Sequence, residues 1–192
     1  MNDRPKVDPR RVAKRFPGDP GREEMVERML RVNHAGEYGA VRIYKGQLAV
    51  LGEKKGAGPV IRHMLEQEKE HLETFDKLVA DRRVRPTAML PFWHLAGFAL
   101  GAGTALLGEK AAMACTVAVE EVIDEHYAGQ VEHLEGEGED NLRNTFEKFR
   151  EDEVAHRDTG LDHGAEGAPG YELLTGAIKA GSRIAIWLST RV

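Results

Sequence analysis

Apolar residues recur three or four positions apart along most of the chain, which is the period of an α-helix with one buried face. The recurrence stops at Gly52 and Gly56, at Pro86, and at the glycine- and acid-rich run 136–140. Glycine and proline commonly end helices. Between these breaks the pattern predicts four long helices, which span residues 22–51, 61–78, 109–134 and 142–156.

The stretch between the second and third predicted helices, residues 86–108, carries no formal charge. It approaches the roughly 20 apolar residues that a membrane span requires, but Pro91, His94 and several glycines interrupt it. We therefore expect a buried connector, or a surface that dips into a bilayer or shields a lipid substrate, rather than a span. A last segment, about 171–188, combines leucine, isoleucine and tryptophan with lysine and arginine. That composition is typical of an amphipathic lid or interfacial helix.

Two of the four long helices carry the sequence Glu-x-x-His, and residues three apart share one face of a helix. Each pair can therefore present a carboxylate and an imidazole to one point in space. Each of the other two long helices places one glutamate on its apolar stripe, where a buried carboxylate needs a partner. Carboxylate-bridged bundles bind two metal ions with this set of residues. The predicted metal ligands are Glu37, Glu68, His71, Glu120, Glu153 and His156.

These elements predict an all-α fold, namely a ferritin-like four-helix bundle with a long apolar crossover and an additional amphipathic C-terminal helix. The lone glutamate precedes the glutamate of its Glu-x-x-His by 31 residues in the first half and by 33 in the second. The two halves therefore repeat one architecture. We expect a single domain over residues 22–192, preceded by a flexible basic arm over residues 1–21. A weak tether to anionic lipid is the alternative interpretation of the arm.

Four glutamates and two histidines form an oxygen-rich donor set that suits iron or manganese, whereas structural zinc sites more often use cysteine. His126 and Tyr127 follow Glu120 by about two helical turns, where they can donate hydrogen bonds near the metals or relay protons. A purely structural role for both is the alternative. The net charge is -5, with both signs interspersed, which argues against nucleic acid as the main partner.

Several runs of residues outside and around the predicted ligands match one family. They include H-A-G-E-Y-G-A around Glu37, Q-E-K-E-H-L around Glu68, G-F-A-L-G-A-G-T-A-L-L-G in the uncharged stretch, and M-A-C-T-V-A-V-E-E around Glu120. From about Glu24 to the C-terminus the chain resembles the 5-demethoxyubiquinone hydroxylase family of ubiquinone biosynthesis. The resemblance implies a di-iron centre, with two Fe ions held by the same six residues and bridged by Glu68 and Glu153.

The resemblance also implies a monooxygenase that uses O2 and two electrons in a late step of ubiquinone biosynthesis. Its substrate would be a polyprenyl methoxy-methyl-benzoquinol, 5-demethoxyubiquinol, whose ring is hydroxylated. The chain shows no dinucleotide fingerprint or phosphate loop, so the electrons are expected from an external reductase or from the reduced quinone itself. The expected partners are the membrane surface, bound peripherally, and a lipid-binding accessory protein.

We expect attachment to the cytoplasmic face of a bacterial cell membrane, or alternatively to the matrix face of the mitochondrial inner membrane. The first thirty residues contain no apolar run that reads as a secretory signal. Two other functions remain open from the residues alone. A ferritin-like iron-binding or storage bundle would load iron without substrate turnover. A peroxide-reducing or radical-generating di-iron protein would use Tyr44 or Tyr127 as its redox partner.

Overall fold

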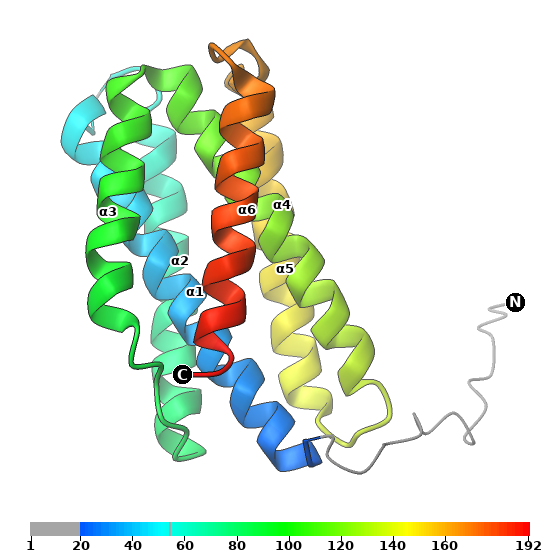
Figure 1. The fold of residues 1–192 in the computed structure, drawn as a ribbon. Coiled ribbons are helices and arrows are strands. Elements are labelled where there is room, and N and C mark those ends of the chain that lie inside the picture. The colour runs from blue at the N-terminus through cyan, green and yellow to red at the C-terminus, as the bar shows by residue number, and fades with distance from the viewer. Residues whose placement is uncertain (1–19, 54) are drawn as a thin grey trace, which may run out of the picture.

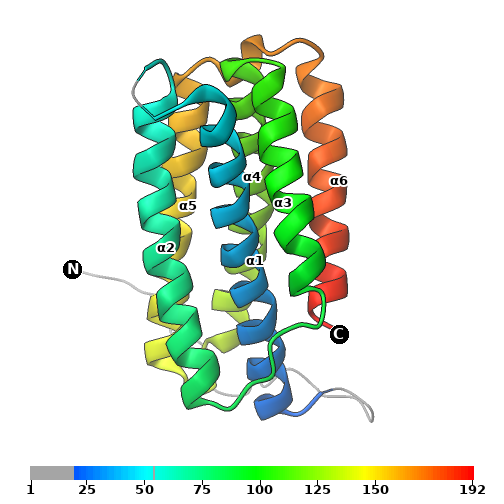
Figure 2. The same cartoon turned by 90° about the vertical axis from the view of Figure 1, so that its left-hand side faces the viewer.

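The computed structural model describes residues 20–53 and 55–192, and within these ranges the chain is helical and has no strand. The 1–19 part of the predicted N-terminal arm lies outside the described residues. Four long helices form a bundle, and two shorter ones cover one of its sides, which faces the viewer in Figure 1 and lies on the right in Figure 2. The bundle contains α1 (Arg22–Leu51), α2 (Gly58–Asp81), α4 (Glu109–Leu134) and α5 (Asp140–Asp162); the cover is α3 (Leu90–Leu106) and α6 (Tyr171–Ser189). The predicted ferritin-like helical bundle is confirmed.

Two apolar clusters fill the interior of the bundle, one toward each end. One cluster contains Val41 and Ile61, and the other contains Leu30 and Phe75. Burial of each such side chain stabilises the fold by about 1.5–3 kcal/mol. Glu37 lies between Leu30 and Val41 on α1, and the other predicted ligands interrupt the apolar faces of their helices in the same way. The polar residues therefore lie across the middle of the bundle, between two apolar plugs.

The uncharged stretch forms a helix of its own, α3, which packs closely along α1. A Cβ atom on Gly101 would collide with the backbone of Ile43, and one on Gly46 would collide with the backbone of Phe98. Glycine at these positions lets the two backbones approach closely. No described helix is long and apolar enough to cross a membrane. One face of α3 is buried against α1, while its other face exposes Phe92, Leu95 and Leu106.

The predicted last helix, α6, packs against α4 and completes the cover. Lys179 forms an ion pair with Glu121, and Arg183 lies 3.0 Å from Glu125. At its far end α6 meets the start of α3, where the Trp93 indole donates a hydrogen bond of 3.0 Å to Ser189. The cover thus holds to the bundle mainly through α1 and α4, the two helices that carry the lone glutamates.

Candidate metal centre

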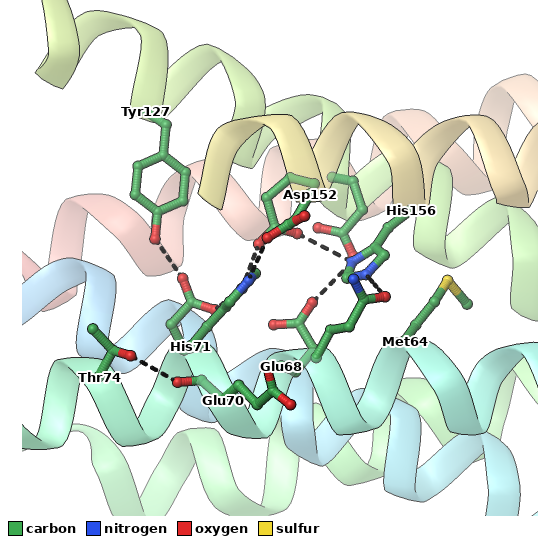
Figure 3. A network of polar contacts seen from close by, with 12 residues as sticks. Met64, Glu68, Glu70, His71, Thr74, Tyr127, Asp152 and His156 are labelled. Carbon is green, nitrogen blue, oxygen red and sulfur yellow. Dashed lines mark hydrogen bonds and ion pairs between the residues drawn. The ribbon is translucent and has the colours of Figure 1, made fainter. Parts of the chain in front are cut away.

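All six predicted ligands lie in the interior of the bundle, with 4% or less of each residue exposed. They form two groups, in each of which the possible ligand atoms lie within 4.8 Å of one another. Glu68 and Glu153 belong to both groups, and Figure 3 shows Glu68 beside His71 and His156. The first group adds Glu37 and His71, and the second adds Glu120 and His156. The arrangement is able to hold a metal ion in either group, with two carboxylates shared.

Both histidines turn the Nδ1 atom toward the carboxylates. His71 Nδ1 lies 3.5 Å from Glu37 Oε2 and 3.3 Å from Glu153 Oε1. His156 Nδ1 lies 3.1 Å from Glu68 Oε1 and 3.4 Å from Glu153 Oε2. Each imidazole is therefore positioned to offer Nδ1 to its own group, and the two rings lie near different oxygens of Glu153.

The other nitrogen of each histidine bonds to an acceptor on the opposite Glu-x-x-His helix. His71 Nε2 lies 3.1 Å from Asp152 Oδ2, and His156 Nε2 lies 3.1 Å from Gln67 Oε1. Because both partners accept, Nε2 carries the proton and Nδ1 keeps its lone pair for a metal. Sequence reasoning did not include Gln67. The available signal was its position, since Gln67 and Asp152 each directly precede the glutamate of a Glu-x-x-His.

Two tyrosines bind the lone glutamates across the bundle. The Tyr127 hydroxyl donates to Glu37 Oε1, and the Tyr44 hydroxyl donates to Glu120 Oε1 over 2.8 Å. Burial, reinforced by the neighbouring carboxylates, raises the pKa of both phenols well above 10. Both tyrosines therefore remain protonated and can donate.

His126, the other residue predicted to act near the metals, contacts a different polar group. Gln130 Nε2 donates to His126 Nε2 over 2.9 Å, and Gln130 pairs through its amide with Asn33 at 2.7 and 3.0 Å. Burial lowers the pKa of His126 to about 4, so its ring is neutral near pH 7. A catalytic role for His126 stays a prediction.

The buried ligand atoms are better suited to bind metal ions than to form hydrogen bonds with one another. Both carboxylate oxygens of Glu68 and of Glu153, and Nδ1 of both histidines, are buried without a hydrogen-bond partner, and such atoms are costly unless something binds them. Burial, followed by repulsion from Glu153, raises the pKa of Glu68 and of Glu120. Divalent cations would satisfy the unpartnered atoms and offset the negative charge. Such a set of carboxylates and imidazoles is typical of iron or manganese.

An apolar cavity of about 530 Å³ lies beside this centre, between the bundle and its cover. Its walls come from α1, α3, α4 and α6, and include Ile43, Leu100, Ile123 and Ile178. Sequence reasoning did not predict this cavity, although the uncharged crossover and the amphipathic last helix are the two segments that enclose it. A small-molecule site of this size and polarity suits a largely hydrophobic ligand.

Comparison with known proteins identifies one family over most of the chain. Residues 24–189 match the family described as ubiquinone biosynthesis protein COQ7. A 3-demethoxyubiquinol 3-hydroxylase from Rhodospirillum rubrum is 61% identical over 178 residues, which is 93% of this chain and 84% of that protein. The NADPH-dependent 3-demethoxyubiquinone 3-hydroxylase of Bos taurus mitochondria is 55% identical, over 88% of this chain and 79% of that protein.

A more distant relative extends the same match. The mitochondrial 5-demethoxyubiquinone hydroxylase of Saccharomyces cerevisiae is 42% identical over 182 residues, which is 87% of this chain and 78% of that protein. The resemblance stated from the sequence is therefore confirmed, and the chain belongs to the COQ7 family of ubiquinone biosynthesis proteins.

Proposed function

We propose that this chain is a 5-demethoxyubiquinol hydroxylase, which adds a hydroxyl group to the ring of a polyprenyl methoxy-methyl-benzoquinol. The observation that carries the proposal is the buried group of four glutamates and two histidines next to an apolar cavity. The hydroxylase names of its relatives agree with it. A storage bundle would have no use for an apolar cavity beside its metal ligands.

The proposed reaction converts a ring C–H bond into C–OH. One oxygen atom of O2 enters the ring and the other leaves as water, so each turnover consumes two electrons and two protons. The name of the bovine relative includes NADPH, and we propose NADPH as the ultimate electron source here too. Two bound iron ions would supply the activation of O2.

The chain's own residues would hold the iron ions and shield them from water. In our proposal Glu37 and His71 would hold one iron ion and Glu120 and His156 the other, and Glu68 and Glu153, which belong to both groups, would contribute to both. Asp152 and Gln67 fix the two imidazoles, and Tyr44 and Tyr127 fix the two terminal carboxylates. The apolar clusters above and below exclude water from the site.

We propose that residues 22–192 form one domain, because neither half of the chain completes the site. The α1–α2 pair supplies three of the ligands and the α4–α5 pair supplies the other three. Each half also depends on the other for the hydrogen bonds that orient its ligands.

We also propose that the protein binds a membrane peripherally through its cover helices. Large apolar side chains are exposed on α3 and α6, including Leu95 at 70% and Trp187 at 55%. A substrate with a long isoprenoid tail is stored in the bilayer, so an enzyme docked there receives it without passing it through water. We propose the cytoplasmic face of a bacterial cell membrane, with the matrix face of the mitochondrial inner membrane as the alternative, and a lipid-binding accessory protein as a further partner.

The test is to load the purified protein anaerobically with ferrous iron, then to add a short-tailed demethoxyquinol analogue, a reductant and ¹⁸O2. Mass spectrometry should show one ¹⁸O atom in the quinone product. Glu68→Ala should abolish this product. Glu66→Ala is the matched control, because Glu66 is exposed on the same helix and forms an ion pair with Lys69; it should retain activity. Two bound irons with unmodified quinone would instead favour storage or peroxide chemistry.

A further inference from the structure

The apolar cavity and the metal centre lie on adjoining faces of the same two helices. On α1, Gly36 and Ala40 line the cavity, one residue before and three residues after Glu37. On α4, Val119 and Ile123 occupy the corresponding positions around Glu120. A ligand whose tail lies in the cavity must therefore send its ring between α1 and α4 to reach the metal ligands.

At this seam the side chains of α1 are smaller than those of α4, although the two halves of the chain share one architecture. The positions one residue before and three residues after the lone glutamate are glycine and alanine on α1, but valine and isoleucine on α4. A Cβ atom on Gly36 would meet only one atom within 4 Å, the Cδ1 of Ile123 at 3.9 Å. Space is thus left open in front of Ile123, on the α1 side.

Helix packing does not require glycine at position 36. At Gly46 and Gly101 a Cβ atom would collide with the backbone of the neighbouring helix, which explains those glycines. At Gly36 an alanine would fit, and it would stabilise the helix interior by about 0.5–1 kcal/mol. Glycine at position 36 therefore does not serve close helix packing. Its effect is to leave open space beside Glu37.

Ile123 lies where the interior of the bundle meets the cavity. Its partly buried side chain packs against the cluster that contains Tyr127 and Phe146 in the bundle, and also against the cluster that contains Val119 and Ile178 beside the cavity. Among the residues that the structure describes, Ile123 is the one partly buried residue that packs against both of these clusters. Rotation of this one side chain would change the width of the seam.

We propose that the gap between Gly36 and Ile123 is the passage by which the quinol ring reaches the metal centre, and that the Ile123 side chain limits the size of the ring substituents that pass. The proposal rests on the proposed function, since it takes the benzoquinol ring with its apolar tail as the ligand. Ile123 is a specificity-determining residue in this assignment, and the absence of a side chain at Gly36 leaves the space in front of Ile123 open.

The first experiment separates occupation of the cavity from access to the metals. The chain has two tryptophans, and Trp93 lines the cavity, so quenching of tryptophan fluorescence by a quinone analogue reports binding without turnover. Gly36→Val should leave the quenching Kd within about twofold of wild type and lower kcat by about tenfold or more, because a small misplacement of the reacting ring is costly. The unchanged quenching Kd would show that Gly36→Val folds, and the double variant Gly36→Val/Ile123→Ala should regain most of kcat.

Gly129→Val is the matched control for the change from glycine to valine within a helix. Gly129 is exposed on α4, does not line the cavity, and has open space around its Cβ position. Its kcat and quenching should match wild type. Ile123→Ala alone should raise the kcat/KM for an ethoxy-substituted ring relative to the methoxy-substituted ring by about fivefold.

A readout independent of turnover distinguishes failure of the passage from failure of the proposed function. In protein loaded with Co²⁺, a ring that reaches the centre should perturb the visible absorption bands of the metal in wild type and not in Gly36→Val. If wild type shows this perturbation but hydroxylates nothing, the passage stands and the hydroxylase assignment falls. If Gly36→Val shows the wild-type perturbation, or if the double variant regains neither kcat nor the perturbation, the passage is wrong.

Discussion

Tyr44 on α1 donates a hydrogen bond of 2.8 Å to Glu120 on α4, so that a phenol from the first half of the chain holds a carboxylate of the second. Tyr127 makes the reciprocal bond to Glu37. Each tyrosine follows the glutamate of its own helix by seven residues and serves the glutamate of the other helix. Each half of the chain therefore supplies the tyrosine that holds the lone glutamate of the other half.

Tyr44→Phe should weaken metal binding by removing this bond to Glu120. Groups that orient a metal ligand typically contribute about 10- to 100-fold in affinity, and the expected loss falls on one of two bound ions. Competition with a chelator, followed by metal analysis, measures it. Tyr38→Phe is the control, because the Tyr38 hydroxyl bonds at 2.6 Å to His94 on α3, which is not a predicted ligand. Equal affinities for both variants would contradict the prediction.

Asp152→Ala should lower metal affinity because His71 loses the acceptor that directs its Nε2 proton. We expect a loss of about 10- to 100-fold. Asp152→Asn keeps an acceptor oxygen and should restore much of the affinity, which a merely structural role would not explain. Asp158→Ala, an exposed change on the same helix that removes an ion pair with Arg157, should bind metal as wild type does. Titration calorimetry distinguishes the three variants.

His126 should make the fold sensitive to acid. Burial lowers its pKa from 6.5 to about 4, so the unfolded chain takes up a proton that the folded chain refuses, and stability falls as the pH drops from 6.5 toward 4. Between pH 7 and pH 5 the contribution is at most about 2 kcal/mol. Urea unfolding at both pH values measures the loss. Between these pH values the free energy of unfolding of His126→Gln should fall less than that of wild type, by about the same 2 kcal/mol. An equal fall in both proteins would show that His126 is not the source of the acid sensitivity.

Gly101→Ala should destabilise the protein, because its methyl group would collide with the backbone of Ile43. Overpacking of this kind costs about 1–3 kcal/mol. Gly103→Ala is the matched change two residues away, where a Cβ atom meets nothing within 4 Å, and it should be neutral or stabilising by up to about 1 kcal/mol. Chemical unfolding should show a lower free energy of unfolding for Gly101→Ala and no decrease for Gly103→Ala. Two similar values would show that α3 does not lie against α1 as described.

Leu95→Glu and Trp187→Glu should each reduce binding to vesicles by about tenfold, since each removes an apolar side chain worth about 1.5–3 kcal/mol on burial. Co-sedimentation with vesicles of phosphatidylethanolamine and phosphatidylglycerol measures the change. Val50→Glu alters an apolar side chain of α1 that is 39% exposed and should bind as wild type does. A loss in the Val50 variant equal to that of the others would remove the case for a docking face on α3 and α6.

The helices and the six-residue cluster were predictable because both depend on spacing within one helix. The pattern placed the bounds of α1 and α4 at the residues observed, and the interval of three placed Glu68 beside His71 and Glu153 beside His156. That these residues bind metal stays a prediction. Such local rules need no knowledge of how the helices cross.

What the sequence did not reveal depends on contacts between helices. The bond from Tyr44 to Glu120 and that from His156 to Gln67 join residues 76 and 89 positions apart, and no periodicity within one helix predicts them. The helical state of α3 was also missed, because a stretch without charges has no polar face to set against an apolar one. Its glycines, which suggested interruption, instead provide the close contact with α1.

These hydrogen bonds between the two halves have a consequence for any shorter form of this protein. A peptide with only α1 and α2 would carry Glu37, Glu68 and His71, but it would lack the acceptor for its histidine and the phenol for its glutamate. Two copies of such a hairpin, related by a twofold axis, would restore every missing partner. The architecture is thus that of two hairpins related by approximate twofold symmetry within one polypeptide, and a single chain allows matched positions to differ, as Gly36 and Val119 do.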